Sequence, residues 1–234
     1  PDGYLRDCPM EHMIMLRILV VLTSVALLIP TAGAEPSSAV AFDVATVKML
    51  KSADPVRGEA LAKEGKCARC HGDAGISDDP EDVNIAGMSA SYIYKQLKDY
   101  KDQNRDDRDM YKTTRDLDEQ QLADLAAWFA SQEPAQPAAD RNMAPAVLRL
   151  VFHGDPERMI KACASCHGQD GRGGQFDHPA LAGQYPEYLV YTLTEFKEED
   201  RSNDIYSRMR SVAQALTEEE IEGLAAYYGA AVPE

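Results

Sequence analysis

The stretch IAGMSASYIYKQLKDYK at residues 85–101 returns as LAGQYPEYLVYTLTEFK at residues 181–197, an offset of 96. Farther along, MYKTTRDLDEQQLADLAAWF from Met110 aligns without a gap with MRSVAQALTEEEIEGLAAYY from Met209, at an offset of 99. A repeat near this length is too long for a solenoid unit and has the size of a small domain. The sequence therefore predicts two tandem domains related by internal duplication.

The hydrophobic residues of each copy recur at helical spacing, three and four apart. The last segments of the two copies illustrate this pattern with Leu122, Leu125, Ala126 and Phe129, and with Ile221, Leu224, Ala225 and Tyr228. Asp118 and Thr217 stand three residues before Gln121 and Glu220, which is typical of a capping box at a helix start. No stretch alternates as a strand would, so the predicted fold class is all-α.

The first residues of the chain read as a secretory leader. Arg17 precedes an apolar run at residues 18–29, and the small residues Ala32-Gly33-Ala34 follow, so we expect cleavage after Ala34 and export to the periplasm. The apolar run is shorter than the roughly 20 residues that span a bilayer, so no integral membrane span is expected in the mature chain. The predicted segments are upstream residues and signal peptide at 1–34, an N-terminal extension at 35–54, a first domain at 55–130, a linker at 131–146 and a second domain at 147–234.

Each copy carries one CxxCH motif, CARCH at residues 67–71 and CASCH at residues 163–167. The two thiols of such a motif can bond covalently to the vinyl groups of a haem, and the histidine can then bind the iron. A zinc ribbon requires its CxxC pairs far closer together, a redox dithiol requires a βαβ context, and a disulfide leaves both histidines unexplained. We expect two covalently bound haem (heme c) groups, held by Cys67, Cys70, Cys163 and Cys166, with His71 and His167 as axial iron ligands.

A methionine is the expected second axial ligand of each iron, because its thioether suits low-spin iron in electron transfer. Met110 and Met209 occupy equivalent positions of the repeat, each shortly before the final helix. Met88 is the reserve candidate in the first domain, although its counterpart in the second copy is Gln184. Met110 and Met209 are therefore predicted to complete the two iron sites.

Several neighbouring residues have predicted roles. A ligating histidine normally donates its other ring proton to a carbonyl, and Pro179, twelve residues after His167, is the expected acceptor; Val83 is its counterpart in the first copy. His153 and His178 have no partner in the other copy and are expected to be exposed to solvent.

Two aromatic residues occupy the same place in the two closing helices, Trp128 and Tyr227. They are expected to pack against helices that carry Gly58 and Gly154, nine residues before each motif, where a missing side chain lets helices approach closely.

The chain is acidic, with a formal net charge of −15. Such a charge makes nucleic acid an unlikely partner and favours basic patches on partner proteins, although it also serves solubility alone.

Taken together, the two CxxCH motifs, the LAG(Q/M) segment with its following aromatic helix, and the methionine before the closing helix resemble the dihaem class I cytochromes of the cytochrome c4 family. The likeness covers nearly all of the chain from about Pro55 to Tyr228. It implies two cytochrome c domains that carry electrons, without enzymatic activity, between respiratory partners such as a quinol-oxidising complex and a terminal oxidase. The 35–54 extension and the shorter loop before Met110 depart from that pattern.

The sequence is also similar to the cytochrome subunit of flavocytochrome c sulfide dehydrogenases, which would make a flavoprotein its electron donor. A third alternative, a dihaem enzyme, requires one iron with an open position, against which the paired methionines argue.

Overall fold

The structure is a computed structural model that describes residues 38, 40, 42–137 and 143–229. The predicted signal peptide, the first residues of the extension, part of the linker and the last five residues lie outside the described residues. Within the described part of the chain, the regular secondary structure is helical, and Asp155 with Ile160 and Gln184 with Gly229 form isolated β-bridges. The predicted all-α fold class is confirmed.

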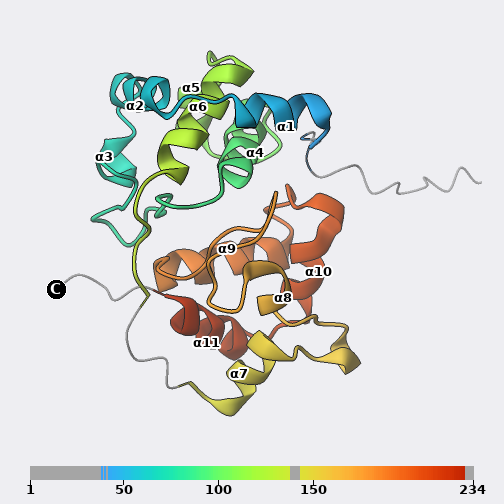
Figure 1. The fold of residues 1–234 in the computed structure, drawn as a ribbon. Coiled ribbons are helices and arrows are strands. Elements are labelled where there is room, and N and C mark those ends of the chain that lie inside the picture. The colour runs from blue at the N-terminus through green and yellow to red at the C-terminus, as the bar shows by residue number, and fades with distance from the viewer. Residues whose placement is uncertain (1–37, 39, 41, 138–142, 230–234) are drawn as a thin grey trace, which may run out of the picture. The chain divides into compact units, whose positions relative to one another are not determined.

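The first half, residues 38–137 as described, contains six helices (Figure 1). They are α1 (Val44–Lys51), α2 (Pro55–Glu64), α3 (Ala68–His71), α4 (Ala90–Lys101), α5 (Arg108–Thr114) and α6 (Glu119–Ala130). The core of this half lies where α6 packs against α2 and α4.

The second half, residues 143–229, repeats this arrangement (Figure 1). Its elements are α7 (Pro145–Phe152), the 3₁₀ turn η1 (Pro156–Arg158), α8 (Ala164–His167), α9 (Pro186–Glu198), the 3₁₀ turn η2 (Ile205–Ser207), α10 (Arg208–Ala215) and α11 (Glu218–Tyr228). Here α11 packs against α9 and α7 around a second core. None of the described helices is long and apolar enough to cross a membrane.

Both closing helices begin as predicted. In α6, Asp118 accepts a hydrogen bond from the Gln121 backbone while the Gln121 side chain accepts one from the Asp118 backbone. Thr217 and Glu220 exchange the same pair of bonds at the start of α11. Each capping box satisfies two backbone donors that the first turn of a helix leaves free.

The close approach of helices at Gly58 is confirmed, but the corresponding prediction for Gly154 is wrong. A Cβ on Gly58 would lie 2.0 Å from the Asp124 carbonyl oxygen and 2.8 Å from Trp128 Cβ, so α2 and α6 touch along their backbones. Gly154 instead follows the end of α7, with a φ of +71° that favours glycine in a turn.

In the second half, the glycine of the close contact lies on the closing helix instead. A Cβ on Gly223 of α11 would lie 2.6 Å from Val147 Cγ2 of α7, and the Tyr227 ring packs edge-on against Phe152 of α7. The reason is an unequal loop: α2 ends three residues before Cys67, whereas α7 ends eleven residues before Cys163.

The N-terminal extension packs on the first half and reaches the second. Val40 is buried in the first core, α1 packs on α6, and the Phe42 ring lies 5.2 Å from the Phe176 ring of the second half. The described part of the extension therefore contributes contacts to both halves.

Candidate haem sites

Each CxxCH motif forms a single helical turn, α3 or α8, with its first cysteine as the N-cap. The backbone N–H of His71 donates to the Cys67 carbonyl, and that of His167 to the Cys163 carbonyl, both at 3.0 Å. Residues three and four apart share a face of a helix, so one turn presents both thiols and the histidine to the same side.

Both histidine rings are oriented by a main-chain carbonyl. Nδ1 of His71 lies 3.0 Å from the Val83 carbonyl oxygen, and Nδ1 of His167 lies 2.9 Å from the Pro179 carbonyl oxygen. The two predicted contacts are confirmed, including the one in which valine replaces proline. A donating Nδ1 leaves the lone pair on Nε2, which is the atom then free to bind a metal.

The protonation behaviour of the site suits neutral ligands. Burial lowers the pKa of the His167 imidazole, although the Pro179 carbonyl opposes this shift, so the ring stays neutral over a wider pH range. Burial also raises the pKa of the Cys67 thiol, and raises that of Cys163 to about 11. Neither pair of motif cysteines is joined as a disulfide.

One cavity of about 1170 Å³ brings the predicted site residues of both halves together. The eight residues that line it from the two motifs and the methionine positions are Cys67, Cys70, His71, Met110, Cys163, Cys166, His167 and Met209. Met110 lies in the first turn of α5 and Met209 in the first turn of α10, so the repeat places them equivalently. Thiols that can bond to vinyl groups, together with oriented imidazoles and thioethers that can bind iron, surround a largely apolar cavity, and this set of groups fits haem c.

The reserve ligand Met88 and the two unpaired histidines have other surroundings. Met88 is buried in the core of the first half and also borders the cavity. His153 is exposed, as predicted. His178 is not, because it is half-buried at the cavity and its Nε2 accepts a hydrogen bond from Arg208 at 3.1 Å.

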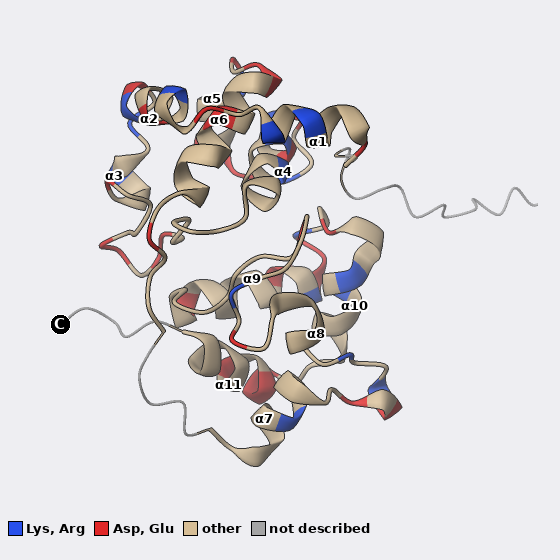
Figure 2. Ribbon diagram, viewed as in Figure 1, with Lys and Arg blue, Asp and Glu red and all other residues tan. Residues whose placement is uncertain are grey.

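Carboxylates surround the first half of the cavity. Its acidic lining residues in this half are Glu81, Asp82, Asp106, Asp107 and Asp109. Burial and the nearby Asp82 carboxylate raise the pKa of Cys70. Figure 2 shows acidic segments in the loop that follows α3. The second half contributes cationic residues as well, among them Lys161 and Arg208.

A buried polar group lies between the two halves, and no pattern in the sequence predicts it. Lys95 and Asp99 on α4 are 2% and 0% exposed, and Arg201 and Asn203 of the second half are buried beside them. Lys95 and Asp99 are four residues apart, a spacing that on sequence alone looks like a solvated ion pair on a helix surface. Only the neighbouring copy, which covers this face of α4, reveals that the group is buried.

Comparison with known proteins agrees with this geometry. The sequence model of the cytochrome c family matches twice, at residues 55–133 and 157–228. Cytochrome c4 from Thiocapsa roseopersicina is 38% identical over 176 residues, covering 74% of this chain and 91% of that protein. The chain belongs to the cytochrome c4 family. It is a dihaem electron-transfer cytochrome whose two domains hold two covalently bound haem c groups.

A solved structure and a second kind of relative extend the comparison. The crystal structure of reduced cytochrome c4 from Pseudomonas stutzeri is similar with a TM-score of 0.71 and 32% identity, and covers 76% of this chain and 98% of that one. A thiosulfate dehydrogenase electron acceptor from Stutzerimonas stutzeri strain A1501 is 30% identical, covering 79% of this chain and 91% of that protein.

Proposed function

We propose that this cytochrome c4 carries electrons in the periplasm and that neither of its irons has an open coordination position, because each is bound by one histidine and one methionine. His71 and Met110 would hold the first iron, and His167 and Met209 the second, while Cys67, Cys70, Cys163 and Cys166 anchor the two haems. A haem so bound supplies a reversible one-electron couple. The residues of the chain fix the ligands, exclude water and tune the potential.

The observation that carries the proposal is the equivalence of the two sites. Each half brings a CxxCH turn, a histidine oriented by a carbonyl and a methionine at the start of a short helix to one shared cavity. An enzyme that transforms a substrate at iron needs an open position on one metal, and an unequal pair of sites would be the expected sign of it. The duplicated donor set favours a carrier.

The donors and acceptors we propose are periplasmic or membrane-bound redox proteins, including a quinol-oxidising complex, a flavoprotein and a terminal oxidase. The predicted leader at residues 1–34 supports export, and the acidic residues along the first half of the cavity favour a partner with a basic surface. The 30% identity to a thiosulfate dehydrogenase electron acceptor supports a second candidate donor, a thiosulfate-oxidising enzyme.

The test is the near-infrared absorbance of the ferric holoprotein, where a methionine–iron bond gives a charge-transfer band. We expect the band at close to two-haem intensity, and loss of about half of it in either Met110→Ala or Met209→Ala. Met88→Leu keeps the volume of the core residue and is expected to keep the whole band. A high-spin ferric haem in the wild-type protein, or loss of half the band in Met88→Leu, would contradict the proposal.

A further inference from the structure

The peptide unit between Val83 and Asn84 lies between a histidine of the first half and a side chain of the second. Its carbonyl oxygen, which belongs to Val83, lies 3.0 Å from His71 Nδ1. Its N–H, which belongs to Asn84, donates to Gln184 Oε1 at 3.0 Å. A peptide unit is planar, so a side chain that fixes the direction of the N–H also fixes the direction of the C=O. Two hydrogen bonds and one rigid plane therefore connect Gln184 to the His71 ring.

The Gln184 end of this connection is buried and held by further bonds. Gln184 Nε2 donates to the Asn84 carbonyl oxygen at 2.8 Å, and Asn84 Nδ2 donates to the Gly183 carbonyl oxygen at 3.0 Å. Gln184 and Asn84 are only 3% and 5% exposed. Hydrogen bonds away from water are electrostatically stronger, and bonds in a chain polarise one another. Gln184 therefore orients the peptide unit and also makes the Val83 carbonyl a stronger acceptor for His71.

The second half does not repeat this connection. The carbonyl that orients His167 belongs to Pro179, and the N–H of the same peptide unit belongs to Ala180. The repeat aligns Gln184 with Met88, whose thioether is a weak acceptor and has no donor. Met88 is buried in the core of the first half, and Ala180 packs against that core. Within the described residues, the Ala180 N–H donates no hydrogen bond. The two histidines thus differ in what lies behind their carbonyl partners.

We propose that Gln184 is a positioning residue of the first haem, which it reaches from the other half through Asn84 and Val83. The inference rests on the proposed binding of the first iron by His71. A histidine that donates its Nδ1 proton to a stronger acceptor is a more basic ligand, and a more basic ligand favours ferric over ferrous iron. Gln184 therefore lowers the reduction potential of the first haem and leaves that of the second unchanged.

The test compares Gln184→Met with the wild-type holoprotein by redox titration followed by proton NMR, which resolves the haem-methyl signals of ferric haems. Met88 shows that the fold accommodates methionine at this repeat position. At a fixed ambient potential we expect the ferrous-to-ferric ratio of the first haem to rise about threefold, which is about 28 mV for one electron. We also expect its ferric methyl signals to move, because they depend on the orientation of the axial histidine ring. The second haem is expected to keep its wild-type ratio.

The matched control is Tyr185→Phe. It removes the neighbouring bond between the halves, from the Tyr185 hydroxyl to the Ser77 carbonyl oxygen at 2.7 Å, and leaves both partners of the Val83–Asn84 peptide unit in place. Tyr185 does not line the cavity, so both haems are expected to keep their wild-type potentials. The exposed Gln214→Met repeats the substitution elsewhere in the second half, with the same expected result.

The variants Met110→Ala and Met209→Ala assign the NMR signals to the two haems. Each methionine lines the cavity from its own half, so its loss alters the signals of that half whether or not the methionine binds iron.

Three results would overturn the role of Gln184. One is a fully loaded Gln184→Met protein whose first haem keeps its wild-type potential and methyl signals. Another is an equal shift of both haems, which would place the effect in the shared cavity. The third is a shift in Tyr185→Phe as large as that in Gln184→Met, which would attribute the effect to the contact between the halves as a whole.

Gln184→Asn decides the matter if Gln184→Met does not take up both haems. It keeps an amide but is one methylene shorter, so it cannot keep both bonds to Asn84, and the same rise and the same overturning results apply. The near-infrared band of the samples tests the methionine ligands separately. A missing band in the wild type contradicts the proposed function, whereas an intact band with an unmoved first haem contradicts only the role of Gln184.

Discussion

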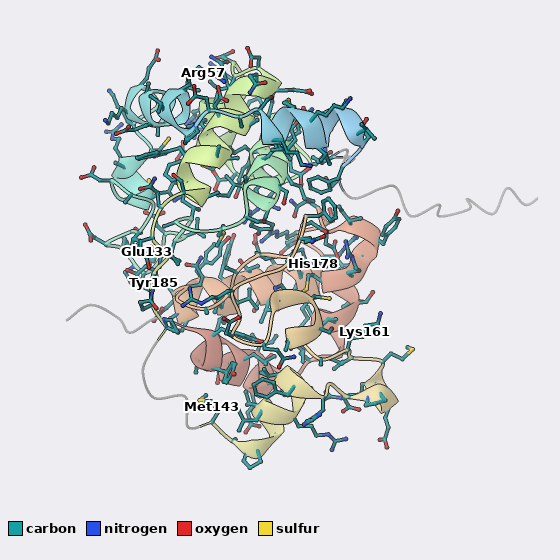
Figure 3. The ribbon with its side chains drawn as sticks, viewed as in Figure 1. Arg57, Glu133, Met143, Lys161, His178 and Tyr185 are labelled. Atoms are coloured by element: carbon teal, nitrogen blue, oxygen red, sulfur yellow. The ribbon has the colours of Figure 1, made fainter. Side chains whose placement is uncertain are left out.

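Gln184 of the second half and Asn84 of the first exchange two hydrogen bonds, from the Asn84 backbone N–H to Gln184 Oε1 at 3.0 Å and from Gln184 Nε2 to the Asn84 carbonyl oxygen at 2.8 Å. Gln184 occupies the repeat position that Met88 holds in the first half. One copy thus uses this position for its core and the other uses it to join the halves. The Tyr185 hydroxyl donates a neighbouring hydrogen bond to the Ser77 carbonyl oxygen at 2.7 Å. Figure 3 labels Tyr185.

Replacing Gln184 by methionine, the residue of the first copy, is expected to weaken the junction. The change leaves the buried N–H and carbonyl of Asn84 without these partners, at a cost of about 2–4 kcal/mol in the free energy of unfolding. Unfolding in guanidinium chloride, followed by the fluorescence emission of Trp128, the single tryptophan, measures this loss of stability. The exposed Gln214→Met is the control, expected within about 0.5 kcal/mol of wild type. Equal stability of the two variants would show that the bond pair does not hold the halves.

Gly58→Ala tests the backbone contact between α2 and α6. The added methyl would overlap the Asp124 carbonyl, and because backbone cannot move aside as a flexible side chain can, we expect a loss of about 3 kcal/mol or more. Glu59→Ala on the same helix removes only a surface pair with Lys63 and is expected to cost less than about 0.5 kcal/mol. Denaturant midpoints of the two variants compare their losses of stability. A small loss in Gly58→Ala would mean that α2 and α6 can move apart.

Local patterns predicted the helices, the capping boxes and the histidine contacts correctly, because each is set by a few residues close in sequence. The His71 ring contacts the Val83 carbonyl and the His167 ring contacts the Pro179 carbonyl, twelve residues later in both copies. The repeat therefore reproduces this geometry. The contact of Gly154 was mispredicted since an equal spacing to the motif does not reveal a longer loop after α7.

The junction between the halves could not be predicted from the sequence, because it depends on docking one copy against the other. Arg201 and Gln96 are 105 positions apart and have no shared pattern, yet they bond at 3.1 Å. Buried charge of this kind looks like ordinary surface charge until the covering surface is known.

The Phe42 and Phe176 rings give the extension a measurable role. Phe42→Ala and Phe176→Ala, together with the double variant, form a mutant cycle in which the coupling free energy is expected to be about 0.5–1.5 kcal/mol, the range for tilted aromatic pairs. Denaturant unfolding of the wild type, the two single variants and the double variant gives this coupling free energy. Phe152 and Phe176 are similarly exposed, so Phe152→Ala with Phe42→Ala serves as an uncoupled control pair. Additive losses at Phe42 and Phe176 would mean that the extension does not contribute through this contact.

Acid is expected to remove part of the stability of the second half through Glu220. Its carboxylate binds Arg158 at 2.7 and 2.9 Å, and this bond lowers the pKa of Glu220 although burial opposes the shift. A carboxyl whose pKa is lower in the folded state stabilises the protein above its unfolded pKa of about 4.3, and this contribution is lost as the pH falls through the folded value.

Glu220→Gln should therefore destabilise the protein by about 1 kcal/mol at neutral pH, a figure that allows for solvent screening of a partly exposed pair, and by progressively less below about pH 4. Denaturant unfolding at a series of pH values checks the trend. Glu222→Gln, exposed on the same helix, is expected to have little effect at any pH. If the Glu220→Gln difference stayed constant down to acid pH, the loss would come from packing or capping by Glu220, because a charge contribution must fade as the carboxyl takes up its proton.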